Sequence, residues 1–215
     1  MSRRSLPAAA ALAAAGTLLL TACGGGDTKT EEQDRIAGAQ DTKKQNSPSP
    51  RTPAPGRPKI ELPEDVKLTF TPEKTGDATK DAVLADSAER IRAVDAAITG
   101  TDPKYRGLNY YSTGRALQAG ADWVQQFKKA KQSMTGTIRY FDRKVTIKNS
   151  ETASLIYCAD ESKGYSKDLK TGKPEVTPVT DKSFVVYNTT LEKNGAGVWQ
   201  TSRIISQRGA SQCRR

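Results

Sequence analysis

The strongest constraint on how this chain can fold is a break in composition near residue 62. Residues 24–62 are rich in Gly, Pro, Ser, Thr, Gln and charged residues and contain almost no large apolar side chains. A segment of this kind cannot bury enough apolar surface to offset the entropy that it would lose on ordering. We therefore expect these residues to form a disordered tether. Residues 63–215 are numerous enough for one hydrophobic core, and we expect a single domain there.

Residues 1–22 have the organisation of an export signal. Arg3 and Arg4 give a basic start, and a run rich in Ala and Leu follows them as far as Ala22. The run contains Pro7 and many alanines, so it falls short of the roughly 20 strongly apolar residues that cross a bilayer. We expect a cleaved leader over residues 1–22 and no membrane-spanning helix.

The leader ends with Leu20, Thr21, Ala22 and Cys23, which together resemble the lipobox of bacterial lipoproteins. The resemblance implies cleavage before Cys23 and a diacylglyceryl lipid on its sulfur, and two acyl chains give stable anchoring. The expected location is the extracytoplasmic face of the cell membrane. An ordinary signal peptide is the alternative interpretation. Residues 2–6 are also similar to a twin-arginine signal, which leaves the export route open.

Histidine is absent from the 215 residues, and this narrows the possible chemistry. The commonest general base, the commonest neutral metal ligand and the usual catalytic triads all require it. Carboxylate, tyrosine and lysine chemistry remains. We expect no metal site and no cofactor.

The formal net charge is +10, but Lys and Arg are scattered among acidic residues along the chain. The densest cluster, residues 128–131, lies within one turn of a predicted helix. We interpret it as a solvated surface. Because no nucleic-acid-binding motif accompanies the charge, we expect no nucleic-acid partner.

Three cysteines occur, and Cys23 is assigned to the lipid. Cys158 and Cys213 remain, in a compartment where thiols oxidise. We predict a disulfide between them, which would stabilise the fold by roughly 4 kcal/mol in the chain-entropy model.

The apolar patterning predicts two helices followed by strands. The first helix covers residues 77–99. Its apolar face carries Leu84, Ala88, Ile91, Val94 or Asp95, and Ile98. The opposite, polar face can carry Asp86, Glu89, Arg90 and Arg92. Gly100 ends it. The second helix begins near Ser112 or Thr113 and fades around residue 133.

Strands are predicted over residues 137–148, 152–160, 183–191 and 198–207, with a hairpin turn at 194–197 and a long exposed excursion at 161–181. A bend at 142–144 could divide the first of these strands, and residues 63–76 could form a short strand or stay extended. The result is an α+β fold, with N-terminal helices packed on a curved antiparallel sheet.

This order of elements, together with the terminal segment 207–213, resembles exported lipoproteins of high-GC Gram-positive bacteria whose folded part is similar to the nuclear transport factor 2-like cone. The resemblance covers roughly residues 78–213 and implies a cavity between the helices and the concave face of the sheet. Some members of that superfamily catalyse reactions there, notably ketosteroid isomerase and scytalone dehydratase, and many others only bind. The histidines of the dehydratase have no counterpart here.

Six aromatic residues are candidates for lining such a cavity, although large rings suit an ordinary core equally well. They are Tyr110, Tyr111, Trp123, Tyr140, Tyr157 and Tyr187. We place Tyr110 and Tyr111 in the loop before the second helix. Three carboxylates are candidate bases, namely Asp122, Asp142 and Asp160, and each could as well face water, lie in a turn or begin a loop.

No complete catalytic constellation emerges, so we assign no catalytic residue. We expect a lipid-anchored, non-catalytic domain that binds an envelope protein or a small ligand. A cavity enzyme that uses a carboxylate and tyrosines on a hydrophobic substrate is the alternative. A solute-binding component of a transporter is a third possibility, but residues 63–215 are few for a two-lobed clamp.

Overall fold

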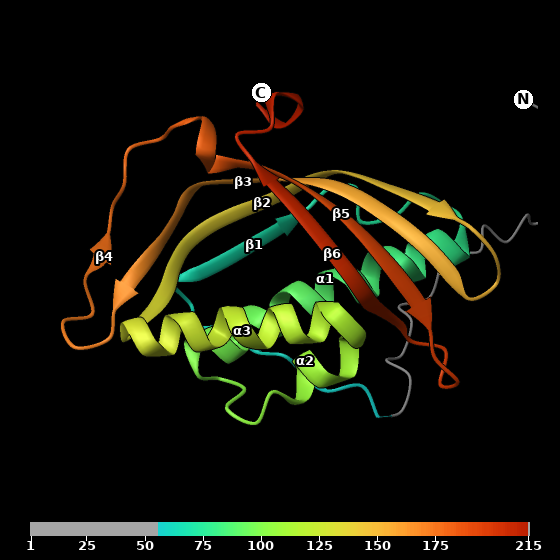
Figure 1. The fold of residues 1–215 in the computed structure, drawn as a ribbon, viewed down its shortest axis with the longest axis horizontal. Coiled ribbons are helices and arrows are strands. Elements are labelled where there is room, and N and C mark those ends of the chain that lie inside the picture. The colour runs from blue at the N-terminus through green and yellow to red at the C-terminus, as the bar shows by residue number, and fades with distance from the viewer. Residues whose placement is uncertain (1–55, 215) are drawn as a thin grey trace, which may run out of the picture. The chain divides into compact units, whose positions relative to one another are not determined.

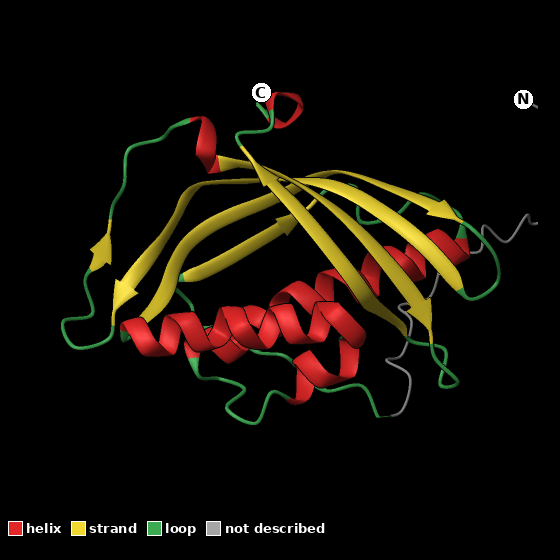
Figure 2. Ribbon diagram, in the orientation of Figure 1, coloured by secondary structure: helices red, strands yellow, loops and turns green. Residues whose placement is uncertain are grey.

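The computed structural model describes residues 56–214. The predicted leader, Cys23 and most of the predicted tether lie outside these residues. The described part confirms the α+β class: a curved sheet arches over three helices (Figures 1 and 2). The helices are α1 (Ala78–Thr99), α2 (Arg106–Tyr111) and α3 (Gly114–Ala130). The strands are β1 (Val66–Phe70), β2 (Gln132–Ile147), β3 (Thr152–Asp168), β4 (Pro174–Glu175), β5 (Phe184–Lys193) and β6 (Trp199–Arg208).

The strands follow the order β1-β2-β3-β5-β6, with the short β4 attached to β3. Strands β2, β3, β5 and β6 form antiparallel pairs as expected, whereas β1 joins β2 in parallel. The parallel pair has a simple cause. All three helices lie between β1 and β2 in the chain, and this long crossover returns the chain to the sheet in its starting direction.

The two longest strands bend, and this gives the sheet its concave face. The β2–β3 register shifts between Thr137 and Arg139 and again between Phe141 and Lys144. The second shift lies at the predicted bend, where Asp142 has a φ of 51°. Strand β2 therefore continues through this position as one bulged strand, since bulges bend a strand without ending it.

Strand β3 extends to Asp168, so the first residues of the predicted excursion are part of the sheet. Gly136 and Gly164 are cross-strand partners near this end of the β2–β3 pair. Gly136 has a φ of +99°, and a Cβ there would lie 2.1 Å from the carbonyl oxygen of Lys163. The close backbone approach at this end of the sheet thus requires glycine.

Helix α1 begins and ends where the sequence predicts. The Asp77 side chain accepts hydrogen bonds from the backbone N–H groups of Thr79 and Lys80, and Gly100 ends the helix in the left-handed conformation. The predicted polar face is wrong in part, because Asp86 and Arg90 are buried. The sheet, α2 and α3 all pack against α1, so little of the helix is left to face water.

Residues 57–62, which we assigned to the tether, contact the domain. Arg57 forms an ion pair with the buried carboxylate of Asp86, and the carbonyl oxygen of Glu61 accepts a hydrogen bond from Thr101 at 2.7 Å. Leu62 packs against the main core. These contacts hold the start of the described chain against α1.

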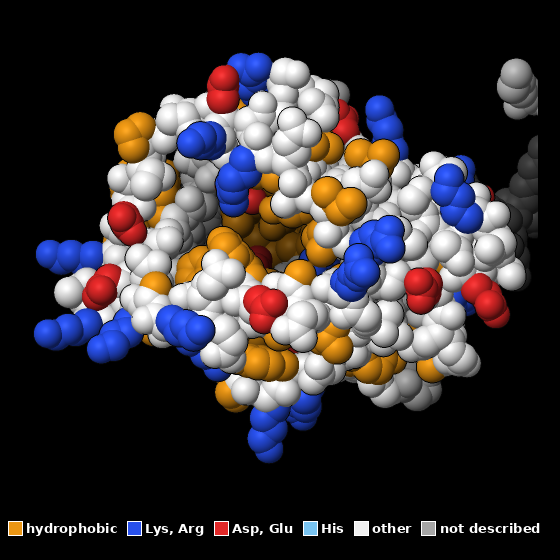
Figure 3. Space-filling view, viewed as in Figure 1, with side chains coloured by type: hydrophobic (Ala, Val, Ile, Leu, Met, Phe, Trp, Pro, Cys, Tyr) orange, Lys and Arg blue, Asp and Glu red, His pale blue; other side chains and the backbone are white. Residues whose placement is uncertain are grey.

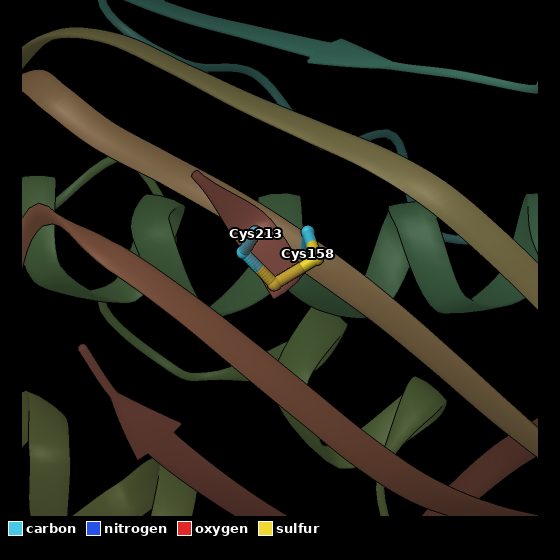
Figure 4. Close-up of a disulfide and its surroundings, with 2 residues drawn as sticks. All are labelled: Cys158 and Cys213. Atoms are coloured by element: carbon cyan, nitrogen blue, oxygen red, sulfur yellow. A yellow bond between two sulfur atoms is a disulfide. The ribbon is translucent and has the colours of Figure 1, made fainter. Parts of the chain in front are cut away.

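The predicted disulfide between Cys158 and Cys213 is confirmed (Figure 4). It joins β3 to a short 3₁₀ helix, Ser211–Cys213, after the last strand. Phe141 and Ala210 complete a small cluster around it, separate from the main core. None of the helices in residues 56–214 is long and apolar enough to cross a membrane.

Candidate functional site: an open cavity with a buried carboxyl group

A cavity of about 550 Å³ lies between helices α1 and α3 and the concave face of the sheet. Its apolar wall includes Ile91, Val94, Ile98, Phe127, Met134 and Ile138. Figure 3 shows its mouth as a hollow with hydrophobic side chains on the floor and acidic side-chain atoms visible inside. The volume is within the range of pockets that hold small molecules, and the interior of the domain is therefore not completely filled by its own side chains.

Asp95 is the most unusual group in this cavity. It lies near the C-terminal end of α1, it is among the cavity-lining residues, and it is 6% exposed. Its Oδ2 has no hydrogen-bond partner in the described part of the chain. Burial raises the pKa of Asp95 to about 8, the charge of Glu161 adds to the rise, and Arg90 opposes it. The carboxyl group is therefore largely protonated at neutral pH and has a proton to donate.

Two tyrosines from the sheet face the same space. Tyr140 and Tyr157 line the cavity, and their rings meet edge to face with centroids 6.0 Å apart. Burial raises the pKa of Tyr157 to about 12 and the pKa of Tyr140 well above its ordinary value. Neither hydroxyl hydrogen-bonds another group among residues 56–214. Both hydroxyls are therefore neutral donors available to a ligand.

Arg90 is a buried cation on the cavity wall. The residue is 7% exposed, and its only hydrogen bond within the described residues runs from Nη2 to the carbonyl oxygen of Ala116 at 3.4 Å. Its Nε has no partner. A Cβ at Gly120 of α3 would lie 2.9 Å from Cδ1 of Leu108 and 3.7 Å from Nη2 of Arg90, so α3 passes close to the guanidinium group at this glycine.

Three further cavity-lining residues, which we call the rim, form a complete hydrogen-bonded group: Glu161, Tyr187 and Arg208. The Tyr187 hydroxyl donates to Oε1 of Glu161 at 3.2 Å, and Arg208 donates to Oε2 of the same carboxylate at 2.7 Å. Tyr187 also stacks on Tyr157 with ring centroids 5.0 Å apart. The rim thus balances its own charge, in contrast to Asp95 and Arg90.

The structure separates the six predicted aromatic residues into two groups. Tyr140, Tyr157, Tyr187 and the half-exposed Trp123 line the cavity. Tyr110 and Tyr111 do not, and they lie at the end of α2 rather than in a loop. Tyr111 is buried and its hydroxyl accepts a long hydrogen bond of 3.4 Å from Arg57, so it packs beside the Arg57–Asp86 ion pair.

None of the three predicted carboxylates lines the cavity. Asp122 is exposed on α3 and accepts a hydrogen bond from Gln118 at 2.8 Å. Asp142 lies at the β2 bulge, and Asp160 pairs with Arg139 at 3.5 Å. Each has one of the ordinary environments that the sequence left open.

Sequence reasoning missed Asp95 and Arg90 as cavity residues. The signal for Asp95 was present, because it follows Ile91 by four residues and precedes Ile98 by three, so a carboxyl group interrupts an apolar stripe. Arg90 gave no such signal, since its burial depends on α3 packing against α1. No group of three or more Asp, Glu or Cys side chains that could hold a metal ion occurs within residues 56–214.

No protein-family model matches the chain, and none of the curated proteins is significantly similar to it. Solved structures show remote similarity. A ketosteroid isomerase-like protein from Erwinia carotovora atroseptica SCRI1043 is 14% identical with a TM-score of 0.39, over 61% of this chain and 97% of that one. The intermembrane space region of the chloroplast protein ARC6 is 12% identical with a TM-score of 0.39, over 63% and 99%.

A domain of unknown function with a cystatin-like fold from Nostoc punctiforme PCC 73102 is 16% identical with a TM-score of 0.39, over 62% of this chain and 79% of that one. Similarity at this level gives no basis for assigning an activity. The function must be argued from the cavity itself.

Proposed function

We propose that the domain binds a small amphipathic molecule in the cavity between α1, α3 and the sheet. The observation that carries this proposal is the unpartnered Oδ2 of Asp95, which is buried in an open, largely apolar space. A buried polar atom without a partner costs about 1–3 kcal/mol, and a ligand that completes its hydrogen bonds recovers part of this free energy. Tyr140 and Tyr157 offer further donors to the same ligand.

The proposal includes the location of the domain. The lipobox-like residues before Cys23 and the composition of residues 24–62 support a domain that is displayed outside the membrane on a lipid-anchored tether. Metabolic labelling with palmitate tests this part. Label should enter the wild-type chain and be absent from Cys23→Ala, and equal labelling of both chains would rule the anchor out.

Ligand binding is tested by closing the cavity. Ala119 is exposed on α3 and lines the cavity, so Ala119→Trp should fill part of the space without disturbing the core. Gln126→Trp on the exposed surface of the same helix is the matched control. Thermal-shift screening of the mature chain against neutral and charged amphiphiles should yield stabilising compounds for wild type and Gln126→Trp only. Equal stabilisation of all three chains would place binding outside this cavity.

A second candidate function, an enzyme that moves a proton on a bound carbonyl compound, has one observation in its favour. Asp95 lines the same cavity as Tyr140 and Tyr157, and with a pKa of about 8 its carboxyl group can both donate and accept a proton near that pH. The test is deuterium uptake from heavy water into carbonyl ligands found in the screen. Uptake that Asp95→Asn abolishes would establish catalysis, and no uptake above the rate without protein would exclude it for those ligands.

A further inference from the structure

Residues 56–214 include two buried arginines without a carboxylate partner, and the protein supplies several hydrogen-bond acceptors to only one of them. Arg143 is 3% exposed, and its guanidinium group donates to the carbonyl oxygens of Pro72 and Leu84 and to the Ser87 hydroxyl at 2.5–3.1 Å. It also lies over the ring of Phe70. Its Nε has no partner, but the protein places three acceptors around the other two nitrogens of this arginine.

Arg90 has no such set. Within the described residues it forms no ion pair, and its one hydrogen bond, to Ala116, is long. Arg143 does not line the cavity, whereas Arg90 does. A buried cation that lacks a counter-ion is strongly destabilising, so its position on a cavity wall indicates that the missing acceptor comes from the ligand.

The other ionisable groups of the cavity also favour an anionic ligand. Glu161 is balanced by Arg208 and by the Tyr187 hydroxyl, so it leaves no negative charge for a cationic ligand. Because Asp95 is largely neutral at neutral pH, the guanidinium group of Arg90 gives the inner cavity an excess of one positive charge. A protonated carboxyl group is also a good donor to an anion.

We propose that the ligand is an amphipathic carboxylate, whose head group accepts hydrogen bonds from Arg90 and whose apolar body packs against Ile91, Phe127 and Ile138. This inference rests on the proposed binding function and adds to it the chemical class of the ligand. A guanidinium–carboxylate contact supplies charge-assisted hydrogen bonds, and in a buried setting these are among the strongest that proteins form. A neutral amphiphile would leave Arg90 without a counter-ion, and a cationic amphiphile would be repelled by the charge of Arg90.

The experiment compares three probes with the same chain length: decanoate, 1-decanol and decylammonium. Binding to the mature chain is measured by calorimetry at pH 6.5. Decanoate should bind about tenfold tighter than decanol, and decylammonium should bind weakest. Arg90→Gln should weaken decanoate by about tenfold and leave decanol nearly unchanged, and Arg90→Lys should retain part of the preference because it keeps the charge.

The matched control is Arg92→Gln. Arg92 lies two residues further along α1, pairs with Glu89 and does not line the cavity, so its removal should leave the order of the probes unchanged. Circular dichroism establishes that each variant is folded, and the ratio of decanoate to decanol affinity is insensitive to a general loss of stability.

Three results would overturn the carboxylate assignment. They are equal affinity for decanoate and decanol in wild type, a preference for decylammonium, and an unchanged preference for decanoate in folded Arg90→Gln. If probes still bind and Ala119→Trp prevents it, the proposed binding function survives while the ligand class fails. If none of the three probes binds wild type, the proposed function fails with it.

Discussion

Helix α1 carries two buried carboxyl groups in opposite situations. Asp86 is 1% exposed, pairs with Arg57 and accepts the backbone N–H of Trp199 at 2.8 Å. Asp95 is 6% exposed, and its Oδ2 has no partner within the part of the chain that the structure describes. The two residues are nine positions apart, or roughly 13 Å along the helix. One end of α1 is thus closed by the protein, and the other end borders an open cavity.

The contrast separates a buried carboxyl group whose hydrogen bonds the fold supplies from one whose Oδ2 it leaves without a partner. At Asp86, a residue from the start of the described chain and a residue of β6 supply the cation and the donor, so the charge is satisfied inside the fold. At Asp95, no other described element supplies an ion-pair partner or a hydrogen-bond donor. Protonation of the carboxyl group is then the remaining way to lower the free-energy cost of its burial. The two carboxyl groups should therefore respond differently to substitution and to pH.

The largest expected effect concerns the pH dependence of stability at Asp95. Its pKa rises from 3.8 in the unfolded chain to about 8 in the fold, so its contribution to stability is present below pH 4 and is lost as pH rises through about 8. At about 1.4 kcal/mol per pH unit, wild type should lose about 5 kcal/mol relative to Asp95→Asn between pH 4 and pH 9. Urea unfolding at a series of pH values measures this.

The groups that face Asp95 are Arg90 on the same helix, Glu161 and Tyr157 on β3, and Tyr140 on β2. They remain present in Asp95→Asn, so the difference between the two chains isolates the carboxyl group. Parallel stability curves for wild type and variant would contradict a protonated Asp95.

The second effect comes from the disulfide, which lies in a small cluster separate from the main core and involves no titrating group. Cys158 and Cys213 are 55 residues apart, and replacing both by Ala should lower the free energy of unfolding by about 4 kcal/mol. The loss should be constant from pH 5 to pH 8, unlike that at Asp95. A reductant added to wild type should reproduce it, and a reductant effect on the double variant would show another cause.

The third effect is at the closed end of α1. Asp86→Ala removes the partner of Arg57 and the acceptor for the N–H of Trp199, so it should destabilise the fold by about 3 kcal/mol. Asp95→Ala, tested at pH 8, should cost less, because no protein group loses a hydrogen bond there. If the two substitutions prove equally costly, the contrast between the two ends of α1 is wrong.

The sequence predicted those elements whose signals are local. Asp77 and Gly100 mark the ends of α1 because capping depends on neighbouring residues alone, and the cysteine pair was predictable by elimination. Helix α2 was missed for the corresponding reason. It is six residues long and contains Gly107, where a Cβ would lie 2.9 Å from the Cβ of Ala93, so its helical form depends on packing against α1.

The candidate site was less predictable, because its chemistry depends on contacts between distant segments. Tyr140, Tyr157 and Tyr187 could be named, since strands alternate their side chains and place large rings on one face. The burial of Asp86 and Arg90 required the positions of Arg57 and α3, which no periodicity along α1 contains. The position of Asp95 within an apolar stripe is the one local sequence signal that indicates a buried carboxyl group.

The smallest expected effect tests how the rim acts on Asp95. The charge of Glu161 is a secondary cause of the raised pKa of Asp95, after burial, so Glu161→Gln should lower that pKa by only a small part of its total rise. The amide still offers an oxygen to Tyr187, and Arg208 is half exposed, so the loss of their ion pair should change stability little. The stability curve of Glu161→Gln should therefore keep the shape of the wild-type curve and shift to lower pH. Glu192→Gln at the exposed end of β5 is the matched control and should shift nothing. A shift to higher pH in Glu161→Gln would contradict the conclusion that the charge of Glu161 raises the pKa of Asp95.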